Sequence, residues 1–134
     1  MLAIVPERVV FAGGELKGVR VVAVSRIAVR AVSEYSEEGP HCVFADAPEQ
    51  RTRVTVITPL GGDDSNPPTM ASSGVLEVRL ARSPATVSRK EIRMLAVVTQ
   101  VSYRATSAGA DRTVEFEALS ADGRTDPVTI VELD

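Results

Sequence analysis

The amino-acid sequence predicts an all-β fold: a single-domain β-sandwich or barrel of seven to eight strands, with a long central loop and at most one short helix. Val, Thr, Ile and Ala fill the segments between clusters of Gly, Pro and Asp, and β-branched residues favour strands. Apolar and polar residues alternate with period two in several of these segments, which is typical of strands with one buried face. The 134 residues suffice for one domain but not comfortably for two, so we expect residues 1–134 to form a single β domain.

Three segments alternate most clearly, namely residues 74–80, 93–103 and 113–119. In the middle segment the odd-numbered residues from Leu95 to Tyr103 share one face, and the even-numbered residues from Met94 to Ser102 share the other. In the outer two segments, apolar residues gather on one face, formed by Leu76, Val78, Leu80, Val114, Phe116 and Ala118. The opposite, outward faces carry three carboxylates, those of Glu77, Glu115 and Glu117.

Further strands are expected at residues 8–12, 19–35, 41–45, 51–58 and 128–133. The run 19–35 contains no Gly or Pro. At ~3.3 Å per residue it could reach about 55 Å, far beyond a typical strand of ~5–6 residues. We therefore expect this run either to be bent by a β-bulge or to extend past the body as an arm.

Helix and loop signals are few. Ser88 and Glu91 have capping-box spacing, so residues 89–95 could form two helical turns, although the apolar residues that follow alternate as in a strand. Residues 46–50 could form a single turn. Residues 59–74, with adjacent prolines and several Gly and Ser, and residues 81–88 are expected to be loops.

Composition excludes several classes of function. The chain has 15 Lys and Arg against 18 Asp and Glu, a net charge of −3, whereas a generic nucleic-acid binder needs a cationic surplus. One Cys and one His cannot form an internal disulfide or a metal site built on several imidazoles. No apolar run reaches the ~18 residues of a membrane span, and the first ten residues lack the pattern of a secretory signal, so we expect no membrane association.

No catalytic or metal-binding set is expected. His41 and Cys42 are adjacent, so in a strand they point to opposite faces and cannot converge as a nucleophile pair. We expect a buried thiol beside a surface or interface imidazole. The serines lack the G-x-S-x-G elbow, and the acidic turns at residues 61–64 and 122–126 lack the alternating ligands of a calcium loop, which favours turn geometry as their role. We therefore expect no metal, no cofactor and no enzymatic activity.

Nearly all of the positive charge is arginine, because Lys17 and Lys90 are the only lysines. Arginine suits partly desolvated contacts between subunits, but a GC-rich genome would also replace Lys by Arg, and both explanations stay open. Arg20, Arg26 and Arg30 on the long run 19–35 would fit self-assembly through polar interfaces.

The order of the segments along the chain is distinctive. A short leading strand and a tight Gly turn are followed by FAGGELKGVRVVAVSR at residues 11–26 and by a Pro/Gly-rich central loop. The chain then closes with VVTQVSYRATSAGADRTVEFEALSADGRTDPV at residues 97–128, where residues 95–103 are expected to pair with 113–119 as a hairpin and a turn at Ser120–Gly123 precedes the last strand. This order resembles the tail-tube proteins of long-tailed bacteriophages and related injection machines, and the closing segment carries most of the resemblance.

The resemblance implies a β-sandwich or barrel that joins its neighbours in a six-membered ring, and rings that stack into a hollow tube through which DNA passes without being read. It implies an acidic lumen, with Glu77, Glu115 and Glu117 as the candidate carboxylates. It implies arms to adjacent subunits at residues 19–35 and in the 59–74 loop, with interface residues Arg20, Arg26, Arg30, Asp63, Asp64, Asn66 and Pro67. The implied partners are copies of the same chain and other tail or baseplate proteins, and the implied location is the virion after assembly in the host cytoplasm.

One departure and two alternatives stay open. Members of this family often carry a helix packed against the sheets, which is not predicted here, so a tail terminator, a distal tail protein or a baseplate protein is also compatible. A different class is a monomeric β-sandwich module that recognises a protein or glycan through the 59–74 loop. A third is an enzyme that uses His41 and Cys42.

Overall fold

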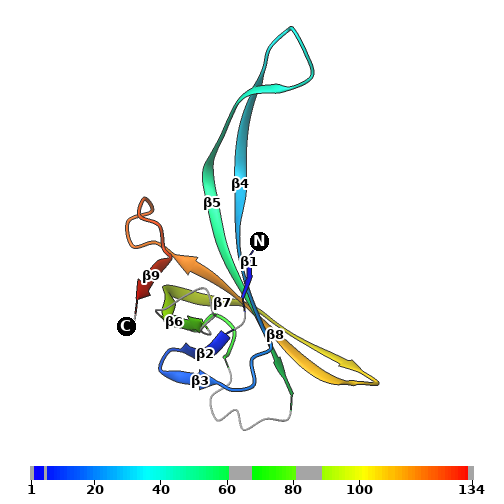
Figure 1. Ribbon diagram of the computed structural model, residues 1–134, viewed down its shortest axis with the longest axis vertical. Coiled ribbons are helices and arrows are strands. Elements are labelled where there is room, and N and C mark those ends of the chain that lie inside the picture. The colour runs from blue at the N-terminus through cyan, green and yellow to red at the C-terminus, as the bar shows by residue number, and fades with distance from the viewer. Residues whose placement is uncertain (1, 5, 61–67, 81–88, 133–134) are drawn as a thin grey trace.

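Antiparallel strands form the framework of the described part of the chain (Figure 1). The structure is a computed structural model, and it describes residues 2–4, 6–60, 68–80 and 89–132. These residues contain no helix and nine strands, so the predicted all-β class is confirmed, with one strand more than the upper limit of the prediction. The strands are β1 (Leu2–Ile4), β2 (Pro6–Phe11), β3 (Gly14–Leu16), β4 (Val21–Tyr35), β5 (Cys42–Pro59), β6 (Ser73–Leu80), β7 (Lys90–Thr106), β8 (Gly109–Leu119) and β9 (Thr129–Glu132).

All nine strands belong to one sheet, in the order β1-β4-β5-β8-β7-β6-β2-β3, and β9 pairs with the start of β7. Phe11 of β2 and Phe116 of β8 lie three positions apart in this order, yet their ring centroids are 4.8 Å apart. The sheet must therefore curl until its two halves face each other. The end strands β1 and β3 are not paired with each other, so the described sheet is not closed into a barrel.

The core lies between these facing halves. One row of paired residues, formed by Val24, Val54, Phe116 and Val98, runs across β4, β5, β8 and β7. In this row, three valines and one phenylalanine are cross-strand neighbours that face the interior. Alternation predicted the buried faces correctly in β6 and β8. The buried apolar residues are Val9, Phe11, Leu16, Val22, Val54, Val56, Leu76, Val78, Ile92, Met94, Ala96, Val98, Val114 and Phe116.

Strand pairing prevails where the sequence left a helix or a turn open. Residues 90–95 form part of β7, which is paired on both sides, as the strand-like alternation after Ser88 favoured. Residues 46–50 continue β5 instead of forming a turn, so the predicted strands 41–45 and 51–58 are one strand. The short strands β1 and β3 were not predicted; β3 arises because a two-residue turn, with Gly13 at φ 84°, returns the chain beside β2.

A β-bulge in β7 shifts the register between Val98 and Gln100. Val101 therefore packs against the core although Leu95, which the sequence placed on the same face, is exposed. The extra residue reverses the direction of every side chain after it.

Two long hairpins leave the body, β4–β5 in one direction and β7–β8 in another (Figure 1). Both expectations for the long run hold in β4, because the strand has register shifts and also projects past the body. We call residues 26–51 the arm, because every described side chain in this range is exposed. Within the described residues, no helix is long and apolar enough to cross a membrane.

Candidate functional site

The arm exposes large apolar side chains that nothing in the described chain covers. Tyr35 is 63% exposed and Phe44 is 51% exposed, and Ile27, Val29, Val32 and Val43 are exposed with them. An isolated two-stranded hairpin is only marginally stable in water, since it has no third strand or second layer to bury its apolar face. Large exposed apolar patches are uncommon on monomeric proteins and are found at protein–protein or membrane interaction sites and in ligand-binding grooves.

The outer half of the arm is acidic. Residues 31–48 contain four carboxylates, those of Glu34, Glu37, Glu38 and Asp46, and no Lys or Arg, so their formal charge is −4. The remaining residues of this half are apolar or neutral. The tip of the arm therefore combines exposed aromatic rings with negative charge, which favours a partner surface that is apolar and basic.

The base of the arm is held to the body by ion pairs. Arg26 lies 2.7 Å from a carboxylate oxygen of Asp126, and Arg51 pairs with Glu117 of β8. Arg30 and Glu49 face each other across the arm at 3.8 Å. The side chains of these pairs are exposed or, at Glu117, half-buried, so each pair contributes at most about 1 kcal/mol. The pairs of Arg26 and Arg51 join the base of the arm to the body.

The three arginines predicted at an interface thus have partners within the chain. Arg20 donates to Asp111 at 3.0 Å, and Arg26 and Arg30 are paired as described above. Their charges are balanced inside the subunit, and the structure does not bring the three together at one place. The other predicted interface residues, Asp63, Asp64, Asn66 and Pro67, lie outside the described residues.

A rigid turn stands beside the base of the arm. Asp122 accepts hydrogen bonds from the backbone N–H groups of Arg124 and Thr125, both at 2.8 Å, and from the Thr125 hydroxyl at 2.7 Å. These donors hold the pKa of Asp122 well below its usual value. The backbone N–H of Val128 and the nearby Arg26 lower the pKa of Asp126 in the same direction. The carboxylates of Asp122 and Asp126 thus stabilise the turn itself through hydrogen bonds. In the described chain, no group of three or more His, Cys, Asp or Glu could hold a metal ion.

The three carboxylates predicted for a lumen all lie on faces turned away from the core, as expected, but in two different places. Glu115 and Glu117 lie two residues apart on β8, where the cross-strand neighbours on β5 are Thr55 and Arg53. Glu77 is on β6, two strands away, opposite Val10 of β2 and Arg93 of β7. The structure therefore brings Glu115 and Glu117 together and leaves Glu77 apart.

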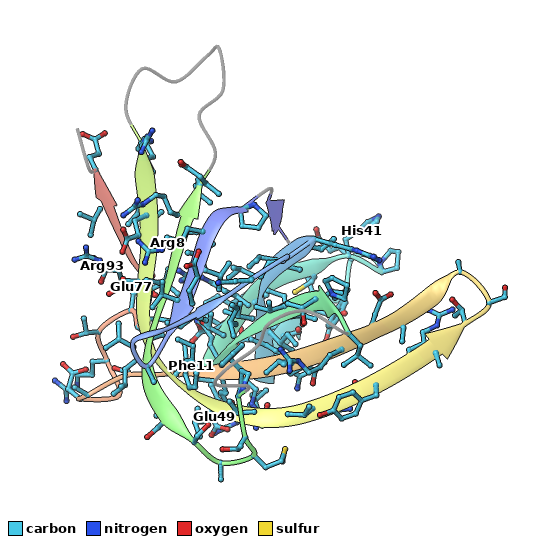
Figure 2. All side chains as sticks on the ribbon, turned by 90° about the horizontal axis from the view of Figure 1, so that it is seen from below. Arg8, Phe11, His41, Glu49, Glu77 and Arg93 are labelled. Atoms are coloured by element: carbon cyan, nitrogen blue, oxygen red, sulfur yellow. The ribbon has the colours of Figure 1, made fainter. Side chains whose placement is uncertain are left out.

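Arginines surround Glu77 on the outer face of β2, β6 and β7 (Figure 2). The next row across these strands is Arg8, Arg79 and Glu91. Glu91 is only 3% exposed and accepts a hydrogen bond of 2.7 Å from Arg93, which raises the pKa of Arg93; the charge of Glu77 adds to this shift. We call residues 8, 10, 77, 79, 91 and 93 the arginine face.

A groove lies next to the arginine face, on the same side of the sheet. Its floor is a row of three outward apolar side chains, Val75, Leu95 and Leu119, and the turn at residues 120–127 forms one wall. Its volume is about 460 Å³, and Arg93 lies at its border. Leu95 is 46% exposed although it stands in the middle of the sheet. We call this feature the outer groove.

Cys42 and His41 are at the tip of the arm, and both are exposed. The expectation of a buried thiol was wrong, because the tip projects beyond the body and no second layer exists there to cover it (Figure 1). The Cys42 thiol donates to the carbonyl oxygen of Phe44 at 2.7 Å. Neither side chain lies in a solvent-excluded cleft of the kind that activates a nucleophile.

The apolar residues of the arm and of the outer groove were not among the predicted site residues. The signal for the groove was present, since Val75 stands on the same face as Glu77 and Arg79, where a polar residue is normal. In comparisons with protein-family models, curated proteins and solved structures, the chain has no match. The fold and these surfaces define an all-β protein with a projecting acidic, aromatic arm and an outer groove beside an arginine face.

Proposed function

We propose that this protein is a structural assembly protein, a subunit that forms stacked rings around a DNA-conducting channel in a phage tail tube or a similar particle. The arm carries the proposal. It presents six large apolar side chains on a two-stranded ribbon, and such a ribbon is stabilised when another protein covers it.

Free strand edges support the same proposal. Among the described residues, the outer edge of β4 has a neighbour only up to Val24, which pairs with Leu2 at the start of β1. The outer edge of β5 has a described neighbour only from Arg53, which pairs with Glu117 near the end of β8. Between these points both strands keep unpaired backbone groups along their outer edges. Such edges invite the addition of a strand from another subunit, which completes the sheet without any chemical reaction.

In this function the carboxylates on β8 would face the channel. Glu115 and Glu117 would repel the DNA phosphates, so that the genome passes without adhering. Glu77 and Glu117 are weaker candidates for this role than Glu115, because arginines compensate their charges. The partners would be further copies of the chain and other tail or baseplate proteins, in a virion assembled in the host cytoplasm.

The test is the state of association of the purified protein. Light scattering after size-exclusion chromatography and electron microscopy of concentrated samples should reveal rings or tubes. A protein that stays monomeric at every concentration and salt would overturn the proposal. A shortened variant, in which an Asn-Gly turn replaces residues 29–49 so that Ala28 and Gln50 close the hairpin, should fold but stay monomeric. None of the buried core residues lies in the removed segment, so its thermal unfolding should resemble that of the wild type.

A further inference from the structure

We propose that the outer groove binds a segment of a partner protein in which a lysine or arginine stands beside apolar side chains. The inference goes beyond the proposed function, because no residue of the arm is among the described residues that line the groove. It names the occupant by its chemistry: an apolar part for the floor of the groove, and a positive charge for the carboxylates of its wall.

The floor of the groove is apolar although it lies on the outer face of the sheet. Val75, Leu95 and Leu119 are cross-strand neighbours on β6, β7 and β8, and all three side chains are exposed. Neighbouring strands are about 4.8 Å apart, so the row spans roughly 10 Å, which suffices for one or two side chains of a bound segment. The volume of about 460 Å³ is within the usual range for binding pockets. Covering the three side chains removes apolar surface from water, which favours binding.

The wall of the groove is a turn that is held in shape by its own hydrogen bonds. Asp122 accepts from the backbone N–H groups of Arg124 and Thr125. The Ser120 hydroxyl donates to the same carboxylate at 3.1 Å, and it accepts from the backbone N–H of Gly123 at 3.1 Å. Because the wall is formed before a partner arrives, binding has little ordering of the turn to offset.

The carboxylate of Asp122 supplies a negative charge that no cation in the described chain balances. Its hydrogen-bond donors are all uncharged groups, namely backbone N–H groups and the hydroxyls of Ser120 and Thr125. Asp126, the second carboxylate of the wall, is balanced by Arg26. A lysine or arginine of a partner segment therefore forms its ion pair with Asp122.

The arginine at the border of the groove does not reverse this preference. Arg93 binds Glu91 at 2.7 Å, and the charge of Glu77 acts on it as well. Arg79 pairs with the same Glu91 at 3.8 Å. These two arginines and two carboxylates balance each other, so Asp122 sets the sign of the field in the groove. An acidic segment, such as the tip of the arm of another copy, is repelled.

Photo-crosslinking with two short probes tests the inference on the full chain. The first probe is a pentapeptide with p-benzoylphenylalanine between two lysines, so an apolar group stands beside positive charges. In the second probe, two glutamates replace the lysines. Mass spectrometry after illumination should locate the first probe on residues 93–95 and 119–129, with about fivefold less attachment of the second probe there. Equal attachment of the two probes in the groove, or attachment of the first probe only elsewhere, such as on the acidic arm, overturns the inference.

Two variants test the floor and the wall separately. Leu95→Ser removes the central apolar side chain of the floor and should reduce attachment of the lysine probe in the groove about tenfold. Asp122→Asn removes the charge but keeps an oxygen that accepts from the N–H groups of the turn, and should reduce attachment about three- to fivefold. Tyr103→Ser and Glu38→Gln, both outside the groove, are the matched controls and should leave this attachment unchanged. Thermal unfolding shows that each variant is folded, and unchanged attachment in Leu95→Ser or Asp122→Asn overturns the inference.

Salt gives a further readout on the unaltered protein. Raising NaCl from about 0.05 M to about 0.5 M shortens the range of electrostatic attraction, and should reduce attachment of the lysine probe in the groove several-fold. Binding through apolar contacts alone does not weaken in this way, so attachment that is independent of salt overturns the inference. The result is separate from the proposed function, because a protein that stays monomeric still has the groove. Rings or tubes that form without attachment of the lysine probe in the groove overturn only the docking site.

Discussion

The two projecting hairpins have the same secondary structure but different support. In β7–β8, the inward side chains Val98, Val114 and Phe116 are buried in the core, and β5 and β6 flank the base of the hairpin. Its outer part is short and mostly polar, with Tyr103 as its one large exposed apolar residue among those described. In β4–β5, the described neighbouring strands reach only to Val24 and Arg53, and every described side chain from Arg26 to Arg51 is exposed. The difference teaches that the β7–β8 hairpin buries its apolar face within its own sheet, whereas the outer part of β4–β5 has no such cover among the described residues.

The largest effect should come from one phenylalanine in each hairpin. Phe116→Ala on β8 removes a fully buried ring that packs against Phe11, and should lower the free energy of unfolding by about 3–5 kcal/mol. Phe44→Ala on the arm removes a half-exposed ring and should change the free energy of unfolding of the monomer by about 0.5 kcal/mol or less. Denaturant unfolding at low protein concentration measures both. Equal losses of unfolding free energy in the two variants would contradict the view that only the β7–β8 hairpin buries its apolar face within the chain.

Two arginines sharpen the same comparison at a smaller scale. Arg93→Met on β7 removes the 2.7 Å hydrogen bond to the buried Glu91, and should lower the melting temperature clearly because that carboxylate loses a close charged donor. Arg30→Met on β4 removes an exposed pair with Glu49 at 3.8 Å and should cost less than about 0.5 kcal/mol. Thermal unfolding of the two variants side by side is the measurement. A stability of the Arg93→Met variant equal to that of the wild type would show that Arg79, 3.8 Å away, suffices to hold Glu91.

Sequence periodicity predicted the body better than the arm for a physical reason. Alternation reveals which residues share a face, and it correctly placed Leu76, Val78, Val114 and Phe116 inward. It does not reveal whether a second layer covers that face. The pattern of residues 19–35 is as strand-like as that of 93–103, yet most of the first stands in solvent. Whether a face is covered depends on contacts between residues distant in sequence, and these contacts arise only when the sheet curls.

The same limit explains what was missed in the candidate site. Alternation placed Leu95 and Val101 on one face of the strand, but the bulge after Val98 puts them on opposite faces. The composition of the segment does not reveal such an extra residue in the strand pairing. The outer groove depends on the row Val75, Leu95 and Leu119 being joined across three strands, and register between distant strands is not a local property of any segment. The ion pairs of Arg20 and Arg26 with Asp111 and Asp126 likewise join residues about a hundred positions apart.

The smallest predicted effect concerns the turn at residues 120–127, which follows β8. Asp126 of this turn forms an ion pair with Arg26 of the arm. The pKa of Asp122 is lowered in the folded state by the backbone N–H groups of Thr125 and Arg124. At acidic pH the unfolded chain therefore binds a proton that the folded chain does not, so stability falls as pH decreases. The contribution of Asp122 is fully present above its unfolded pKa of about 4, and is lost progressively as pH falls below that value. Asp122→Asn should therefore lower the melting temperature slightly at pH 7 and make its decline between about pH 5 and pH 2 shallower. Glu38→Gln on the arm is the control for the loss of one negative charge, and an Asp122→Asn variant that declines as steeply as the wild type would show that this turn does not couple its carboxylate to folding.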